Sequence, residues 1–194
     1  MPPFAISRRS RGPAACRFGR FFAASSGSAA IEFGLIGGAC VFLIIETMQA
    51  ALFLYTSASL NQATAAAMRK VMTGAASSQK LTAAQFRDQI LCPLLPAVMP
   101  CSNIVTNIQT VQPGVAPDGF YAFVNADRSG VTQPAMNNNN TSFDTGASSQ
   151  VVYAQVYYAM PVLSPAWRSV GAADWNGSTV HFVSAAAAFK NEPF

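Results

Sequence analysis

The residues with the clearest potential for chemistry are one glycine–serine bond and the carboxylate that follows it. Gly27 and Ser28 open the stretch Gly-Ser-Ala-Ala-Ile-Glu-Phe, which ends at Phe33. If the chain were cut after Gly27, Glu32 would be the fifth residue of the product. Its carboxylate would then lie about one helical turn from the new amine of Ser28, so the spacing favours pairing of the two charges.

A second carboxylate, Glu46, lies fourteen positions after Glu32. Fourteen steps of about 100° fall about 40° short of four full turns, so both carboxylates share one face of a helix. A carboxylate within a bilayer costs about 2.5–3.5 kcal/mol, which predicts that each has a partner or a role. For Glu32 the alternative is a place at the inner membrane interface, where the dipole at the helix N-terminus favours an acid.

The element that must position these groups is an apolar helix. From Phe33 to Tyr55 only Glu46, Thr47 and Gln49 are clearly polar. A helix of that length extends roughly 34 Å, enough for a hydrocarbon core of roughly 30 Å. We therefore expect a transmembrane segment at about 33–55 within a long helix over 28–74.

The segment before the helix, residues 1–27, is basic. It contains five arginines and no acid precedes Glu32. Basic residues beside a membrane helix favour the cytoplasmic side, which predicts a cytoplasmic leader and an exported α+β domain over 75–194. The remaining seven basic and eight acidic residues leave the rest of the chain near neutrality, so the basic balance indicates a topogenic leader and no nucleic-acid partner.

Together, the basic leader, the Gly-Ser-Ala-Ala-Ile-Glu-Phe junction and the apolar helix resemble the processing site of TadE/TadF-type pseudopilins. These are minor-pilin-like proteins of the tight-adherence (Flp, type IVb) pilus system. The resemblance implies a prepilin peptidase that cuts between Gly27 and Ser28, and it matches Glu32 and Phe33 to the family's processing and assembly motif. Glu46 matches a late helical acid, and the closing Asn-Glu-Pro resembles the end of many members.

Gly34 and Gly38 form a small-xxx-small pair within the same helix. This spacing allows close approach of two membrane helices, which predicts a contact with a pilin-like partner. The alternative is that glycine is simply frequent in membrane helices. Many members of the family have proline where this chain has Gly38, so no proline kink is expected.

Two cysteines of the exported part, Cys92 and Cys101, are flanked by prolines. An oxidising compartment favours a disulfide between them, and the alternative is a pair of reduced buried thiols. Their spacing does not fit a CxxC redox or zinc motif, and we expect no metal and no cofactor.

Beyond Tyr55 the pattern changes from a helix to a sheet. Apolar residues at three- and four-residue steps continue the helix to a stop at Gly74, and a Thr82–Gln85 capping box indicates a second helix within 77–91. Strands are expected at 104–111, 120–124, 151–160 and 179–189, with turns that include 174–177 and a mobile polar loop at 137–140. The fold class is therefore α+β, a long N-terminal helix followed by a small, mainly antiparallel β domain, as in pilins.

The exported part contains one histidine, His181, in an apolar strand context. No second histidine exists to build a common metal site, and no nucleophile motif supports a triad with Asp174 or Asp144. We therefore expect a structural histidine, no enzyme and no small-molecule substrate, with an exported hydrolase as a rival hypothesis.

The sequence thus predicts a single-pass subunit of the bacterial inner membrane, with its N-terminus cytoplasmic and its C-terminal domain periplasmic. Its expected partners are the membrane, a prepilin peptidase, other pilin-like subunits and the pilus assembly platform, with incorporation into a surface pilus as a further expectation. The main alternative is a generic anchored, exported binding protein of the cell envelope that is never cut.

Overall fold

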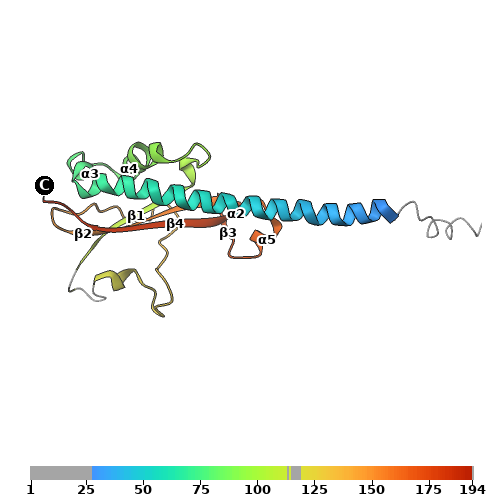
Figure 1. The fold of residues 1–194 in the computed structure, drawn as a ribbon. Coiled ribbons are helices and arrows are strands. Elements are labelled where there is room, and N and C mark those ends of the chain that lie inside the picture. The colour runs from blue at the N-terminus through green and yellow to red at the C-terminus, as the bar shows by residue number, and fades with distance from the viewer. Residues whose placement is uncertain (1–27, 113, 115–118, 194) are drawn as a thin grey trace, which may run out of the picture. The chain divides into compact units, whose positions relative to one another are not determined.

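The computed structural model describes residues 28–112, 114 and 119–193 (Figure 1). Its contacts divide the chain into two compact units, Met1–Ile44 and Ile45–Phe194, and each is described by itself. A single helix, α2 (Ser28–Met72), supplies the described part of the first unit and the opening element of the second.

In the second unit, α2 buries one stripe of side chains. Leu60, Ala63, Ala67 and Val71 recur at three- and four-residue steps, and all four are buried. Arg69 and Lys70 lie on the exposed side of the last turn, where cations suit the helix dipole. The helix ends at Met72, and Gly74 follows with φ 74°, a left-handed conformation that glycine adopts without steric cost. The predicted amphipathic continuation and its glycine stop are confirmed.

The sheet of the second unit has four antiparallel strands. They are β1 (Ile104–Val111), β2 (Val151–Pro161), β3 (Ala173–Trp175) and β4 (Ser178–Lys190), in the order β1-β2-β4-β3. The three longer strands confirm the expected segments at 104–111, 151–160 and 179–189. A long N-terminal apolar helix and a small antiparallel sheet confirm the α+β class.

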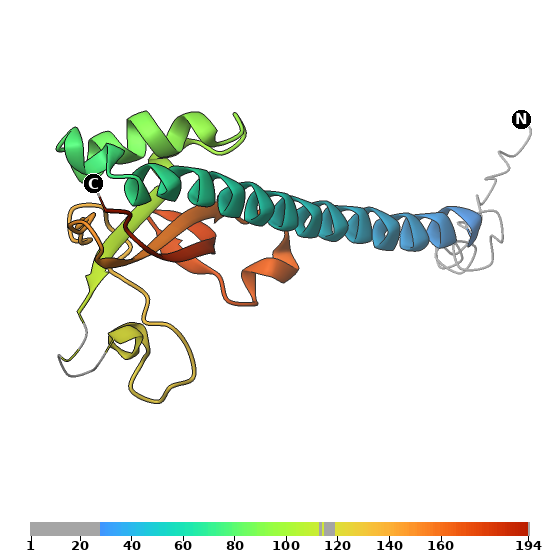
Figure 2. The same cartoon turned by 60° about the vertical axis from the view of Figure 1, so that its left-hand side comes forward.

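Alternation along β2 decides which face of the sheet meets the helix. Val152, Ala154 and Val156 join the same buried cluster as Leu60 of α2. The intervening Tyr153 points to the other face, where aromatic rings of the β1–β2 connection pack on it. In Figure 2 the sheet accordingly lies between the C-terminal half of α2 and the 119–135 part of that connection.

The expected strand at 120–124 is wrong. Gly119–Phe123 forms a 3-10 helix, and Val124 makes only an isolated bridge to Val131. Phe120 and Phe123 both contact the ring of Tyr153, with centroids 6.2 and 4.5 Å away. A strand would place residues three apart on opposite faces, whereas a helical turn places them on one side.

The fourth strand comes instead from the region predicted as a turn at 174–177. Ala173–Trp175 pairs with the start of β4 through the two-residue loop Asn176-Gly177. Both loop residues have positive φ, 49° and 77°, as a type I′ hairpin turn requires. The turn expected at 174–177 is present at Asn176-Gly177, whereas the short strand before it is not predicted by the sequence.

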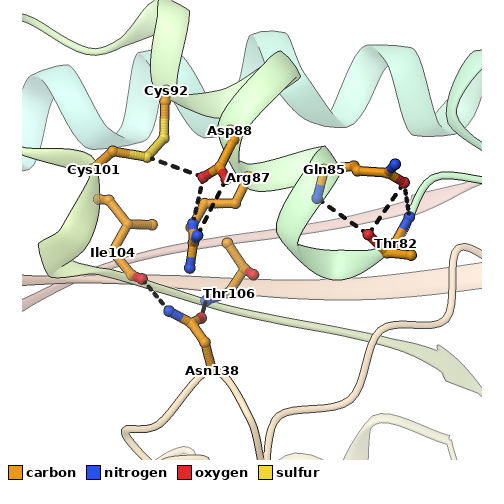
Figure 3. A network of polar contacts seen from close by, with 9 residues as sticks. All are labelled: Thr82, Gln85, Arg87, Asp88, Cys92, Cys101, Ile104, Thr106 and Asn138. Atoms are coloured by element: carbon orange, nitrogen blue, oxygen red, sulfur yellow. Dashed lines mark hydrogen bonds and ion pairs between the residues drawn. A yellow bond between two sulfur atoms is a disulfide. The ribbon is translucent and has the colours of Figure 1, made fainter.

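The helix expected within 77–91, with Thr82 and Gln85 as its capping box, is confirmed for residues 83–91. The segment is divided into α3 (Ala75–Ser78), α4 (Ala83–Phe86) and a π-helical turn, η3 (Arg87–Leu91). Thr82 and Gln85 form the predicted capping box, shown in Figure 3. An N-cap needs extended backbone, and Thr82 has ψ 163°, so the capping signal itself excludes a helix that runs through it.

Within the expected mobile loop at 137–140, Asn138 is fixed against the edge of the sheet. Its side-chain oxygen accepts from the Thr106 amide at 3.2 Å, and its side-chain nitrogen donates to the Ile104 carbonyl at 2.7 Å (Figure 3). Farther along β1, Ile108 exchanges backbone hydrogen bonds with Ser142 and Asp144. These contacts satisfy backbone groups that an edge strand would otherwise present to another chain.

Candidate functional site

The first unit presents an apolar surface on its described residues, 28–44. The most exposed large side chains here include Phe33, at 79% exposure, and Leu35, at 75%. From Ala30 to Met72 the helix is long and apolar enough to cross a membrane. Of its most apolar 18-residue stretch, 6% is buried. Length and composition would thus allow this helix to cross a membrane, and its most apolar stretch is mostly exposed, unlike the core helix of a soluble protein.

The residues of the cleavage motif fall at the beginning of the described chain. Gly27 and the basic leader lie outside the described residues, and Ser28 is the first residue given for α2. Glu32 and Phe33 follow in the first turns of α2, and both side chains are exposed. Glu32 and Phe33 therefore lie on the helix surface and are not part of the packed core.

Gly34 and Gly38 also lie in the first unit. A Cβ placed on either glycine meets no atom within 4 Å among the described residues. The glycines therefore leave a shallow strip on the helix surface that a second helix would be able to approach, as the small-xxx-small spacing predicts.

The second carboxylate, Glu46, belongs to the second unit and is held there by the segment after β2. Its Oε1 accepts a hydrogen bond from the hydroxyl of Ser164, a side chain with 0% exposure. The same hydroxyl accepts from the Trp167 amide and so caps the short helix α5 (Pro165–Arg168). One buried hydroxyl thus joins a helix carboxylate to the backbone of a distant turn.

Gln49, one turn after Glu46, binds the same segment with both ends of its amide. Its oxygen accepts from the Leu163 amide at 3.1 Å, and its nitrogen donates to the Pro161 carbonyl at 3.4 Å. Its side chain is only 2% exposed. A buried amide whose donor and acceptor are both used fixes the strand end in one position.

Aromatic contacts complete this site. The ring of Phe53 lies 5.4 Å from that of Trp167, which in turn lies 5.4 Å from the His181 ring in an edge-to-face arrangement. His181 Nε2 is 2.7 Å from the Trp167 carbonyl oxygen. Thr56 extends the site by one more turn, with its hydroxyl 3.6 Å from the sulfur of Met160.

These contacts change the expected far end of the membrane segment. A bilayer span that continues to Tyr55 would place Gln49 in lipid, yet Gln49 is buried against the end of β2. Glu46 correspondingly lies at a protein contact in the second unit. Residues 46–55 are thus part of the folded domain on this face, and a span compatible with the packing ends near Ile45.

Sequence reasoning singled out Glu46, as an intramembrane acid, but did not identify Gln49 or Ser164. A signal for Gln49 was present, because positions 46, 49, 53 and 56 continue the spacing of the buried residues Leu60, Ala63 and Ala67. Ser164 carried the weaker signal of a serine directly before a proline at the start of a helix. No sequence pattern indicated which helix residue it would contact.

The disulfide lies elsewhere in the second unit. Cys92 and Cys101 are joined, with their Cα atoms 5.7 Å apart, as predicted. Asp88 lies close enough to both sulfurs to suggest a metal site, but bonded sulfurs are not available as thiolate ligands. Its carboxylate instead accepts from Arg87 at 2.8 Å (Figure 3).

Three other titratable side chains, those of Asp144, Asp127 and His181, have structural contacts. Asp144 accepts from the Thr110 hydroxyl at 2.8 Å and the Gly146 amide at 2.9 Å. Asp127 accepts from the hydroxyl and amide of Ser129, and these hydrogen bonds lower the pKa of its carboxyl. His181 is hydrogen-bonded to a backbone carbonyl, an arrangement that suits the expected structural role.

Comparison with known proteins found no match to a family model, to a curated protein or to a solved structure. The motif at the start of α2 and the contacts of its later turns are therefore the features that bear on function.

Proposed function

We propose that this chain is a non-enzymatic, pilin-like subunit that takes part in building or using a tight-adherence (Flp, type IVb) pilus. In this proposal it belongs with the TadE/TadF-type pseudopilins, crosses the bacterial inner membrane once and is cut by a prepilin peptidase after Gly27. The observation that carries the proposal is that the two parts of α2 have different surroundings. The helix exposes apolar side chains before Ile45 and becomes the spine of an antiparallel sheet domain after it.

The span that fits this division runs from Ser28 to about Ile45. Eighteen residues of helix extend roughly 27 Å, close to the hydrocarbon thickness of a bilayer. The leader stays in the cytoplasm, and the sheet domain folds in the periplasm, where an oxidising environment suits the Cys92–Cys101 disulfide.

Glu32 is the residue to which we assign recognition and register. After cleavage its carboxylate lies one turn from the amine of Ser28, on the same chain or on a neighbouring one. An unpaired charge in a low-dielectric setting is costly, so pairing with an amine favours one register of helix against helix. The exposed strip at Gly34 and Gly38 provides a surface for such an approach.

The first test is the N-terminus of the full chain, purified from the envelope of a bacterium that carries the matching prepilin peptidase. Intact-mass measurement and N-terminal sequencing are expected to give a protein that begins at Ser28. Replacing Gly27→Leu is expected to leave the arginine leader attached. A native chain that retains its leader in the presence of an active peptidase would contradict the proposal and favour a generic anchored protein.

The second test separates the role of Glu32 from general damage to the helix. Glu32→Ala is expected to reduce cleavage, incorporation into the assembly, or both. Gln62→Ala, at an exposed position in the second unit, is the control and is expected to change neither. Normal cleavage together with normal pilus output in Glu32→Ala would remove the role assigned to this carboxylate.

A further inference from the structure

The 161–170 segment, Pro161–Val170, exposes apolar side chains although it is firmly held. Leu163 and Val170 are each 70% exposed, one on each side of α5. Arg168, also exposed, lies between them. The segment therefore combines two aliphatic side chains and one cation on a short, well-fixed turn.

The backbone of this segment is positioned by the first turns of α2 in the second unit. Ser164 is bonded to Glu46, and the Leu163 amide to Gln49. The Trp167 ring packs on Phe53. The amide of Leu163 is thus bound to the buried Gln49, while its side chain is exposed. The fixed backbone therefore holds the Leu163 side chain in its exposed position.

These same turns come directly after the apolar stretch proposed to cross the membrane. If the span ends near Ile45, Glu46 and Gln49 leave the bilayer first, and the segment bound to them lies at the outer lipid boundary. Met48, between these two residues in the chain, is also strongly exposed. Amphipathic helices show that apolar side chains beside Lys or Arg suit the boundary between headgroups and acyl chains.

We propose that the 161–170 segment is a membrane-contact site, in which Leu163 and Val170 insert among the lipids of the periplasmic leaflet. Arg168 binds the phosphates of the headgroups, with which a guanidinium forms strong charge-assisted hydrogen bonds. The site sets the orientation of the sheet domain on the membrane surface. This inference rests on the membrane crossing in the proposed function, and it does not depend on cleavage or on pilus assembly.

The test uses the full chain in nanodiscs of phosphatidylcholine and phosphatidylglycerol. A fluorophore is attached to one cysteine at a time, at Leu163→Cys or Val170→Cys, in a background with Cys16→Ser and Cys40→Ser. Labelling is done without reductant, so that the Cys92–Cys101 disulfide is preserved. Emission is then measured with quenchers attached to the lipid acyl chains and, separately, with iodide in the water.

Two further labels act as matched controls. Val98→Cys is an exposed aliphatic position in the loop after η4 (Cys92–Leu94), whose neighbours Leu94 and Pro96 line a groove beside residues 55–66, farther along α2. The native Cys40, kept in a second background, is exposed on the proposed span and reports insertion of the helix.

Lipid-attached quenchers are expected to cause a large loss of emission at 163 and 170, similar to the loss at Cys40, and little loss at 98. If 163 and 170 are instead quenched by iodide like 98, while Cys40 is quenched by lipid, the contact site is refuted and the membrane crossing stands. If Cys40 is also quenched by iodide alone, the membrane crossing itself fails. Protection of 163 and 170 from both quenchers would refute the lipid contact and favour a protein partner at this surface.

Discussion

Gln49 offers the sharpest test of how α2 is joined to the sheet domain. Replacing Gln49→Ala removes both hydrogen bonds to the end of β2 and leaves the Leu163 amide and Pro161 carbonyl without their partner. A typical net hydrogen bond contributes about 0.5–1.5 kcal/mol, and a buried group left unpaired costs about 1–3 kcal/mol. Because Gln49 is buried, we expect the variant to lose about 2–4 kcal/mol of stability in the 161–170 segment.

The assay is hydrogen exchange of the full chain in detergent, followed by mass spectrometry of peptides that cover residues 161–170. Every 1.4 kcal/mol changes an equilibrium constant by about tenfold, so the expected loss corresponds to exchange about 30- to 700-fold faster through local opening. Peptides from β1 and from the middle of β2 are expected to change much less, because their hydrogen bonds are made within the sheet.

Two other variants test whether the lost hydrogen bonds are the cause of the faster exchange. Gln49→Leu keeps most of the side-chain volume but makes neither hydrogen bond, so it is expected to resemble Gln49→Ala if hydrogen bonding is what holds the segment. Asn61→Ala removes an exposed side chain that donates to the Ser57 carbonyl at 2.8 Å, and it is expected to change stability by less than about 0.5 kcal/mol. If Gln49→Ala changes exchange no more than Asn61→Ala does, the reasoning about this contact is refuted.

Three further predictions concern the sheet domain. Replacing Cys92 and Cys101 by serine opens a short loop, and the free energy of unfolding should fall by roughly 2.5–3 kcal/mol in denaturant titrations, with no effect of reductant on the variant. Asn138→Ala removes both bonds to the edge of β1, so faster exchange and more self-association are expected, and unchanged light scattering would argue against its protective role. Burial raises the pKa of Tyr157 and of Tyr158 above 10.0, so the stability that their neutral form contributes is complete below about pH 10 and is lost as the pH rises through the folded-state values. The phenolate absorbance of Tyr157 and Tyr158 should therefore appear above pH 10.0, and complete ionisation of both side chains near pH 10 would contradict this.

The contacts of Glu46 show that a polar residue in an apolar helix can bind a distant part of its own chain. From the sequence, the residue resembles an intramembrane acid in need of a partner. In the structure its partner is Ser164, 118 positions away. The expectation that a carboxylate in this stretch has a partner is met by the protein's own domain, which moves the proposed membrane boundary toward Ile45.

Local signals determined a large part of this fold from the sequence. Apolar spacing gave the buried stripe of α2, β-branched and aromatic runs gave the three longer strands, and the Thr82 capping box was placed correctly. Gly74 was placed correctly as the helix stop. All of these depend on neighbours within a few residues in the chain, where periodicity and backbone preference act directly.

The errors arose where contacts between distant segments outweighed local preference. Phe120 and Phe123 have high strand propensity, yet both pack on Tyr153 from a helical turn. Asn138, in a run of four asparagines, replaces a neighbouring strand at the edge of β1. Propensity describes how a residue suits an average environment, and these environments exist only after β1 and β2 have paired.

By itself, the sequence determined the long apolar helix, the Gly27–Glu32 motif at its start, the α+β order and the cysteine pair. Only the tertiary structure decided that the stripe at 46, 49, 53 and 56 packs against the end of β2 and that the 161–170 segment exposes Leu163 and Val170. The physical reason is that a helix period shows which residues share a face. What that face contacts depends on segments more than 100 positions away, whose arrangement is set by strand register and packing.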